Sequence, residues 1–132
     1  MCSSDLVLSQ LKLVIRTNYS NPQIHGATVV ATVLNTPALR ALWEEELNEM
    51  RVRIKHMRHK LVHGLMQAGV KQDMSFITTQ IGMFSYSGLS KDQMVRLRSE
   101  FGIYGTDTGR MCVAALNSKN IDYVCAAIAK VL

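Results

Sequence analysis

The sequence lacks the features that would place it in several specialised classes of protein. No apolar run reaches the length of about 18 residues that a membrane-spanning helix needs, so we expect no membrane contact. The three cysteines, Cys2, Cys112 and Cys125, cannot all pair, and their spacing fits no zinc motif. Residues 1–6 have neither the charged start nor the apolar segment of a signal peptide, which predicts a cytoplasmic location.

Length and composition are those of an ordinary globular domain. The chain has 132 residues, of which 48% are hydrophobic and 19% are charged. This composition excludes an extended disordered chain, a collagen-like fibre and a disulfide-dense miniprotein. The 15 Lys and Arg against 10 Asp and Glu give a net charge of +5, and so small an excess is weak evidence for a nucleic-acid partner.

The first half of the chain has the pattern of helices. Apolar residues at helical spacing predict a helix over residues 6–19, which Pro22 ends. Residues 24–34 are small and apolar, and we interpret them as a buried helix, although their β-branched content leaves a strand possible. A third helix is predicted over residues 36–68, because Thr36-Pro37 is a start signal and Gly69 is a plausible end cap.

The third predicted helix is long for so small a domain. About thirty residues at a rise of about 1.5 Å each make a rod of roughly 45 Å. Its acidic residues lie toward its start and its basic residues toward its end, an order that favours the helix dipole only modestly. The length suggests a connection between two bodies rather than one element of a compact bundle.

The pattern changes in the second half of the chain. Strands are predicted over residues 76–79, 83–86, 103–106 and 110–116, where β-branched, aromatic and apolar residues form short runs. Helices are predicted over residues 90–101, with Ser90 as the cap, and 117–132. The second half is therefore an α/β layer.

Two groups on the long helix are weighed as binding sites. His56, His59 and His63 share a face and could bind a metal, but no carboxylate or cysteine joins them, so we favour a solvated helix face and expect no metal. The basic residues between positions 51 and 60 could contact a phosphate backbone. Because no aromatic residue is interleaved and an acidic run precedes them, a solvated face is favoured there too.

Arg110 is the strongest single candidate for a binding residue. It follows the turn Thr108-Gly109 and enters an apolar strand, where a guanidinium needs an anionic partner. A ligand carboxylate would suit it, because the two groups can form paired hydrogen bonds. The alternative is an internal ion pair, for which Asp107 is the obvious partner.

Four segments occur in an order typical of one enzyme family. They are residues 9–12, 16–22, 82–89 and 108–114, which are SQLK, RTNYSNP, GMFSYSGL and TGRMCVA. In this order they closely resemble the C-terminal part of the aspartate and aromatic-amino-acid aminotransferases, the class I pyridoxal-phosphate enzymes. The resemblance runs from about residue 8 to residue 132, and it implies an α/β fold, the C-terminal part of a fold-type I transferase that depends on pyridoxal phosphate (PLP).

The resemblance implies that the chain is a fragment. The family's missing front part carries the Schiff-base lysine and the groups that bind the cofactor, pyridoxal 5'-phosphate, and no lysine here lies in a matching motif. By the same resemblance, residues 1–35 are a helical remnant of the large cofactor-binding domain, residues 36–69 the connecting helix, and residues 70–132 the small α/β domain that closes over substrate. Residues 1–6 do not resemble the family, and we expect them to be a translated sequencing-adapter end.

The resemblance also assigns substrate-binding roles to four residues and a catalytic role to none. Arg110 matches the arginine that binds the substrate α-carboxylate. Arg16 matches the arginine that reaches into the other subunit's site of a homodimer and binds the distal carboxylate of dicarboxylic substrates. Asn21 and Phe84 match residues that line the substrate space.

The function that the resemblance implies is transamination between aspartate or an aromatic amino acid and a 2-oxo acid such as 2-oxoglutarate, with this chain inactive alone. A small non-enzymatic binding or interaction domain is the alternative. Gln23 replaces a proline common in the family after Pro22, and Asp107 replaces part of a small-residue turn, so it could partly neutralise Arg110. Residues 111–113 lean toward the aromatic branch, which leaves the substrate preference open.

Overall fold

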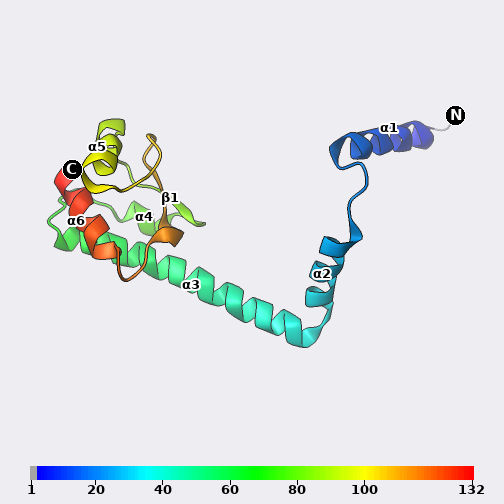
Figure 1. Cartoon of the computed structure of the whole chain (residues 1–132), viewed down its shortest axis with the longest axis horizontal. Coiled ribbons are helices and arrows are strands. Elements are labelled where there is room, and N and C mark those ends of the chain that lie inside the picture. The colour runs from blue at the N-terminus through cyan, green and yellow to red at the C-terminus, as the bar shows by residue number, and fades with distance from the viewer. Residues whose placement is uncertain (1–2) are drawn as a thin grey trace. The chain divides into compact units, whose positions relative to one another are not determined.

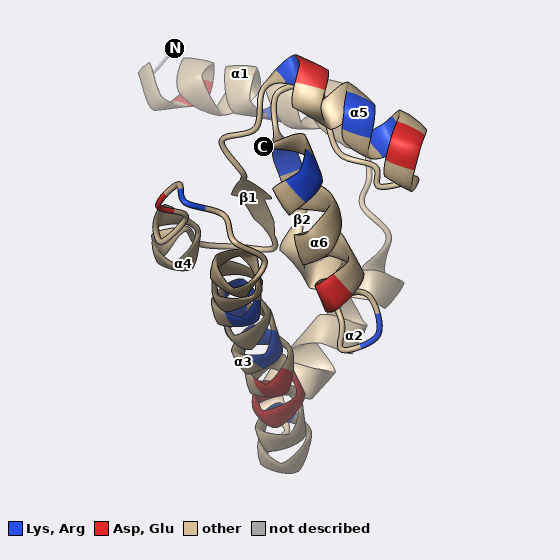
Figure 2. Ribbon diagram, turned by 90° about the vertical axis from the view of Figure 1, so that its left-hand side faces the viewer, with Lys and Arg blue, Asp and Glu red and all other residues tan. Residues whose placement is uncertain are grey.

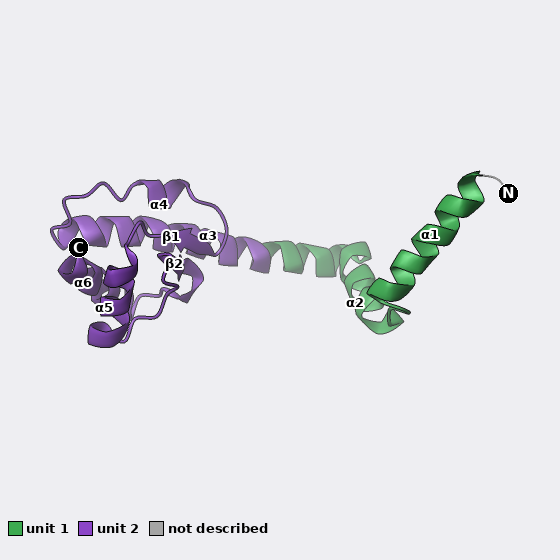
Figure 3. Ribbon diagram, turned by 90° about the horizontal axis from the view of Figure 1, so that it is seen from above, with its two compact units in different colours: residues 1–45 green, residues 46–132 purple. Residues whose placement is uncertain are grey.

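The computed structural model describes residues 3–132, which divide into two compact units, residues 3–45 and residues 46–132 (Figure 3). In chain order the elements are α1 (Ser3–Asn18), α2 (Ile24–Asn35), α3 (Pro37–Gln67), α4 (Phe76–Thr79), β1 (Phe84–Tyr86), α5 (Lys91–Phe101), β2 (Arg110–Cys112), the 3-10 helix η1 (Val113–Ala115) and α6 (Ile121–Val131) (Figure 1). Within residues 3–132, no helix is both long enough and apolar enough to cross a bilayer.

The first unit contains α1 and α2, both of which confirm predicted helices. After α1 the backbone turns at Ser20, whose φ of 57° is left-handed, and Pro22 follows. The prediction that α2 is buried is wrong for this chain, since none of its residues is buried and Val29 and Val30 are 50% and 57% exposed. The apolar pattern sets the helix, but burial requires a facing apolar surface, and residues 3–45 provide none that encloses it.

The helix α3 has the predicted limits at both ends. The residue before Pro37 is extended, as proline requires, and its carbonyl accepts a hydrogen bond from the Arg40 amide (2.9 Å). At the other end Gly69 has a φ of 87°, and the amides of Gly69 and Val70 donate to the carbonyls of Met66 and Leu65 (3.1 Å each). Most of its acidic residues lie toward its start and most of its basic residues toward its end (Figure 2).

The second unit has a single hydrophobic core, formed by the C-terminal half of α3 with α5, α6 and the loops between them (Figure 1). Its most enclosed side chains include Leu61 of α3, Leu97 of α5 and Ile128 of α6, all at most 1% exposed. The helices α3 and α6 approach so closely that a Cβ on Gly64 would lie 2.6 Å from Cys125 Sγ. Glycine at position 64 is therefore a packing requirement.

The sheet of the second unit is smaller than predicted. The antiparallel pair β1–β2 places Phe84 opposite Cys112 and Tyr86 opposite Arg110. The prediction of a strand over residues 103–106 is wrong, because that segment pairs with no strand in the described chain. The strand predicted over residues 110–116 ends at Cys112, where the Met83 carbonyl accepts from both Val113 (2.8 Å) and Ala114 (3.3 Å) and the chain turns into η1.

The prediction of a strand over residues 76–79 is also wrong, since these residues form the single turn α4. The Asp73 carboxylate accepts a hydrogen bond from the Ser75 amide (2.8 Å), and the hydroxyls of Thr78 and Thr79 donate to carbonyls three residues back. These local bonds satisfy the backbone without a neighbouring strand and outweigh the β preference of Ile and Thr.

The two remaining helices are confirmed. Ser90 caps α5 in a capping box, in which its hydroxyl accepts from the Gln93 amide (3.3 Å) and the Gln93 side chain accepts from the Ser90 amide (2.8 Å). The helix α6 begins later than predicted, because the Asn117 and Asn120 side chains form a turn: Asn117 Oδ1 accepts from the Lys119 amide (2.9 Å), and Asn120 Oδ1 from the Asn117 amide (2.8 Å).

Candidate functional site

Arg110 lies at the first position of β2, immediately after a tight turn. Gly109 has a φ of 81°, and a Cβ there would lie 2.8 Å from the Leu89 carbonyl oxygen, so only glycine fits. The Gly109 carbonyl accepts hydrogen bonds from the amide (2.9 Å) and the hydroxyl (2.8 Å) of Ser87. The turn is therefore attached to the segment after β1, and the backbone of Arg110 is held firmly.

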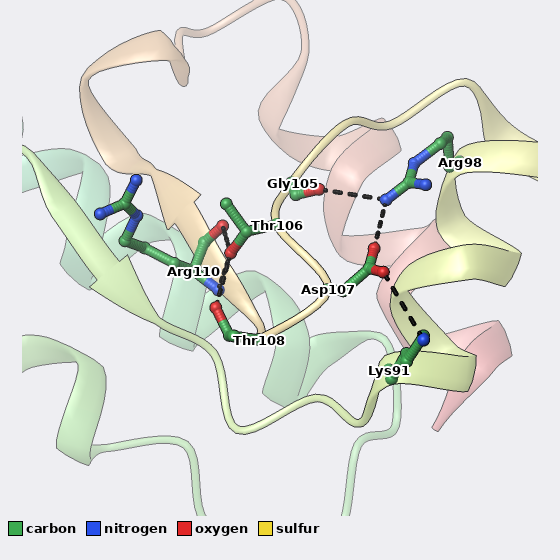
Figure 4. A network of polar contacts seen from close by, with 7 residues as sticks. All are labelled: Lys91, Arg98, Gly105, Thr106, Asp107, Thr108 and Arg110. Carbon is green, nitrogen blue, oxygen red and sulfur yellow. Dashed lines mark hydrogen bonds and ion pairs between the residues drawn. The ribbon is translucent and has the colours of Figure 1, made fainter.

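The turn is also closed on itself (Figure 4). The Thr106 amide donates to the Arg110 carbonyl (3.1 Å), and the Arg110 amide donates to the Thr106 hydroxyl (3.2 Å). The hydroxyls of Thr106 and Thr108 lie 2.8 Å apart in a further hydrogen bond. These bonds fix the direction in which the Arg110 side chain leaves the strand.

The Arg110 guanidinium is exposed and lies over the ring of Phe84, with its central carbon 5.0 Å from the ring centroid. This cation–π contact orients the guanidinium plane and leaves its N–H groups available. Among residues 3–132, no carboxylate lies within ion-pair distance of Arg110. Such an arginine has the chemistry of a receptor for a ligand carboxylate.

Asp107 is not the partner of Arg110, so the prediction that it partly neutralises this arginine is wrong. Its Oδ1 accepts a hydrogen bond from Arg98 Nη2 (2.7 Å), and its Oδ2 lies 4.0 Å from Lys91 Nζ. The hydrogen bond from Arg98 is the main cause that lowers the pKa of the Asp107 carboxyl. In Figure 4 the side chains of Asp107 and Arg110 leave the loop in different directions.

A second arginine, Arg58 of α3, is buried beneath the strand that carries Phe84. It is 2% exposed and donates to the carbonyls of Ile77 (3.1 Å), Gly82 (2.7 Å) and Phe84 (2.8 Å), and to Ser85 Oγ (2.9 Å). Burial lowers its pKa. Carbonyl dipoles take the place of a counter-ion, so Arg58 fixes β1 to α3 and thereby sets the position of the Phe84 ring.

The prediction of a solvated face for the basic residues between positions 51 and 60 is wrong for Arg58. The missed signal is its spacing: it lies four residues after Ile54 and three before Leu61, on the apolar stripe of the helix. Arg53, although exposed, is also an anchor, since it donates to the carbonyls of Ala114 (2.9 Å) and Leu116 (3.0 Å). Within the described chain, no group of three His, Cys, Asp or Glu side chains is placed to hold a metal.

The four predicted substrate-binding residues fall in both units. Phe84 and Arg110 come from the second unit, which brings them into contact. Arg16 lies in the last turn of α1 and is exposed, and Asn21 follows the turn at Ser20; both belong to the first unit. The roles of all four residues stay predictions.

The described residues contain no enclosed lysine to which pyridoxal phosphate could be attached. Covalent attachment needs an enclosed lysine, and every lysine of the chain is exposed. The lysine in the Arg110 neighbourhood, Lys91, lies beside Asp107. The chain thus carries an arginine suited to a substrate carboxylate but no enclosed lysine for covalent attachment of this cofactor.

Comparison with known proteins places this chain in a family. The family "Aminotransferase class I and II" matches residues 1–128, so the match includes residues 1–6, contrary to our expectation that the resemblance begins near residue 8. An aspartate aminotransferase of Pseudomonas aeruginosa is 61% identical over 126 residues, which are 96% of this chain and 32% of that protein. The chain therefore spans about a third of the length of this curated relative.

Solved structures of aminotransferases also match this chain. An aromatic-amino-acid aminotransferase of Burkholderia pseudomallei, covalently bound to pyridoxal phosphate, matches with a TM-score of 0.90 and 62% identity over 97% of this chain and 32% of that one. An aromatic amino acid aminotransferase of Psychrobacter sp. B6, cocrystallised with aspartic acid, matches with a TM-score of 0.87 and 46% identity over 96% of this chain and 32% of that one. These similarities confirm the predicted fold, and the chain belongs to the class I and II aminotransferases.

Proposed function

We propose that the whole protein to which this chain belongs transfers an amino group between an amino acid and a 2-oxo acid, and that this chain supplies part of its substrate-binding surface. The observation that carries the proposal is the geometry of Arg110: exposed, held by a closed turn, over the Phe84 ring and without a carboxylate partner in residues 3–132. Both aspartate and aromatic amino acids are proposed substrates, because relatives of both names match this chain.

Arg110 would bind the α-carboxylate that every amino-acid substrate carries. Its planar fork can form paired hydrogen bonds to the two carboxylate oxygens, which fixes the orientation of the substrate as well as its position. Phe84 would hold the guanidinium plane from one side. Arg16 would bind a second carboxylate, which only dicarboxylic substrates carry, and Asn21 would line the substrate space.

Pyridoxal phosphate, the cofactor of the covalently bound relative, would supply the electron sink for the reaction, held by residues outside this chain. By itself the chain would be inactive, because its lysines are all exposed and none is enclosed beside Arg110. A homodimeric assembly and a cytoplasmic location are part of the same proposal. They rest on the family resemblance and stay predictions.

The proposal is tested by restoring a full-length protein. This chain replaces the corresponding third of the Pseudomonas aeruginosa relative, to which it is 61% identical, and the chimera is assayed with aspartate or phenylalanine and 2-oxoglutarate. We expect turnover of at least one of these amino acids, and a loss with Arg110→Lys for each amino acid that is turned over. Lysine keeps the charge but loses the planar pair of donors.

Two outcomes would contradict the proposal. A chimera that folds, binds pyridoxal phosphate and still turns over neither amino acid would favour the alternative, a non-enzymatic interaction domain. An active chimera whose Arg110→Lys variant keeps full activity would remove Arg110 from substrate binding and leave only the family assignment.

A further inference from the structure

Asp107 is the one acidic residue in the turn that presents Arg110. The turn spans residues 106–109 and is closed by the Gly109 amide, which donates to the Thr106 carbonyl (2.9 Å). Asp107 and Arg110 are three positions apart in the chain. Extended backbone would span at most about 11 Å between them, and the turn makes the real span shorter. In the structure the two side chains leave the loop in different directions (Figure 4), so an Asp107–Arg110 ion pair would form only if the Arg110 side chain left the Phe84 ring and turned toward Asp107.

Such a pair would compete directly with a substrate carboxylate. A guanidinium already bound to one carboxylate offers fewer donors to a second, and its charge is partly neutralised. The structure contains a different arrangement, in which two cations of α5 bind Asp107: Arg98 Nη2 at 2.7 Å from Oδ1 and Lys91 Nζ at 4.0 Å from Oδ2 (Figure 4). Both oxygens therefore face α5.

We propose that Arg98, assisted by Lys91, holds the Asp107 carboxylate away from Arg110 and so keeps Arg110 available for a substrate carboxylate. Arg98 is then a positioning residue, which acts on substrate through Asp107 and Arg110 without contacting substrate itself. The inference rests on the proposed function, since it assumes that Arg110 binds the substrate.

The position of Arg98 supports this role. It lies in the last turn of α5, which the Ser90 capping box and the buried Met94 and Leu97 hold in place. A cation on a rigid helix captures a carboxylate on a loop at low entropic cost. Arg98 Nη2 also lies 3.4 Å from the Gly105 carbonyl, so a purely structural role in anchoring the loop is the alternative that the experiment must separate.

The test uses the full-length chimera described above with the variants Arg98→Ala, Asp107→Ala and the double variant. Arg98→Ala should raise KM for aspartate about two- to fivefold with little change in kcat, the range expected from one competing surface ion pair. Asp107→Ala should leave KM unchanged or lower it. The double variant should return to the KM of the parent chimera, because no carboxylate is left to compete.

Arg96→Ala is the matched control. Arg96 is on the same helix and forms a comparable exposed ion pair, with its Nε 2.8 Å from Glu100 Oε1, but this pair lies outside the turn. Its removal should leave KM unchanged. Calorimetric binding of succinate, an unreactive dicarboxylate, gives a readout besides turnover: its Kd should rise with Arg98→Ala and recover in the double variant.

Each contrary result has a distinct meaning. If Asp107→Ala raises KM as much as Arg98→Ala, or if the double variant stays impaired, Arg98 only anchors the loop and the inference is wrong. The inference is also wrong if Arg98→Ala has no effect while Arg110→Lys weakens binding. If Arg110→Lys itself changes nothing, the proposed role of Arg110 fails, and this inference fails with it.

Discussion

The two units of this chain are both helical, but only one of them has a core. In residues 3–45 no side chain is buried, and large apolar residues such as Leu11 and Val30 are 52% and 57% exposed. In the second unit, Leu61, Ile77 and Leu97 have no exposed surface at all. Local signals such as apolar spacing, caps and proline positions form helices in either setting, whereas burial depends on what the rest of the unit provides.

This difference predicts that equivalent substitutions have different effects in the two units. Removing a buried polar side chain with many hydrogen-bond partners in the second unit should lower the free energy of unfolding. Removing an exposed polar side chain in the first unit should change it little. Replacing a glycine inside a helix by alanine should destabilise the second unit but stabilise a helix of the first.

The largest effect is expected at Arg58. Arg58→Met removes a buried cation that serves three carbonyls and the Ser85 hydroxyl, and leaving such groups without donors should lower the free energy of unfolding by about 3–5 kcal/mol. Urea denaturation followed by circular dichroism measures this. Arg40→Ala is the counterpart in the first unit: it removes an exposed pair with Glu44 (2.9 Å) and should cost less than about 0.5 kcal/mol. Equal losses would contradict the distinction between the units.

Gly64 and Gly26 should respond to alanine with opposite signs. Gly64→Ala places a Cβ 2.6 Å from Cys125 Sγ, and this overpacking, about 1–3 kcal/mol, exceeds the gain in helix propensity of about 1 kcal/mol. Nothing lies within 4 Å of a Cβ on Gly26, so Gly26→Ala should stabilise α2, which amide hydrogen exchange would detect. In a Cys125→Ala background the penalty at position 64 should shrink. A penalty that persists there would mean that the sulfur is not its cause.

A smaller effect is expected at alkaline pH from Cys125. Burial raises the pKa of this thiol from 9.0 to about 11, with the Asp122 charge as a lesser cause. The unfolded chain therefore loses the proton first, so the free energy of unfolding should be insensitive to this group below pH 9 and should fall as the pH rises from 9 toward 11. Lysines and tyrosines also titrate in this range, so the comparison is with Cys125→Ala. If both proteins show the same pH slope, the thiol makes no contribution.

How far the sequence predicts this structure depends on the range of the forces involved. The limits of α3 were predictable because Pro37 and Gly69 act on the backbone next to them. The strand assignments failed at residues 76–79 and 103–106, where the outcome depends on hydroxyl and carboxylate hydrogen bonds and on the absence of a pairing strand in the described residues. A run of β-branched residues does not reveal whether a pairing strand exists.

In the candidate site, too, features set by neighbouring residues were predictable and features set by distant residues were not. The turn that presents Arg110 was predictable from Gly109, but the exposure of its guanidinium over the Phe84 ring was not. The actual partner of Asp107 was not, because Arg98 reaches it from a helix nine residues earlier in the chain. Arg58 could have been identified from its place on the apolar stripe of α3, but its carbonyl partners belong to a loop whose fold the sequence analysis misassigned.

Steady-state kinetics of two lysine variants decide whether Arg110 binds the carboxylate common to all substrates. In the full-length chimera, Arg110→Lys should lower kcat/KM about ten- to a hundredfold for aspartate and phenylalanine alike, the loss expected for a charge-assisted hydrogen bond. Arg16→Lys should cause a comparable loss with aspartate and little with phenylalanine, which lacks the second carboxylate. If Arg110→Lys leaves phenylalanine turnover intact, or if Arg16→Lys affects both substrates equally, the assignment of the two arginines is wrong.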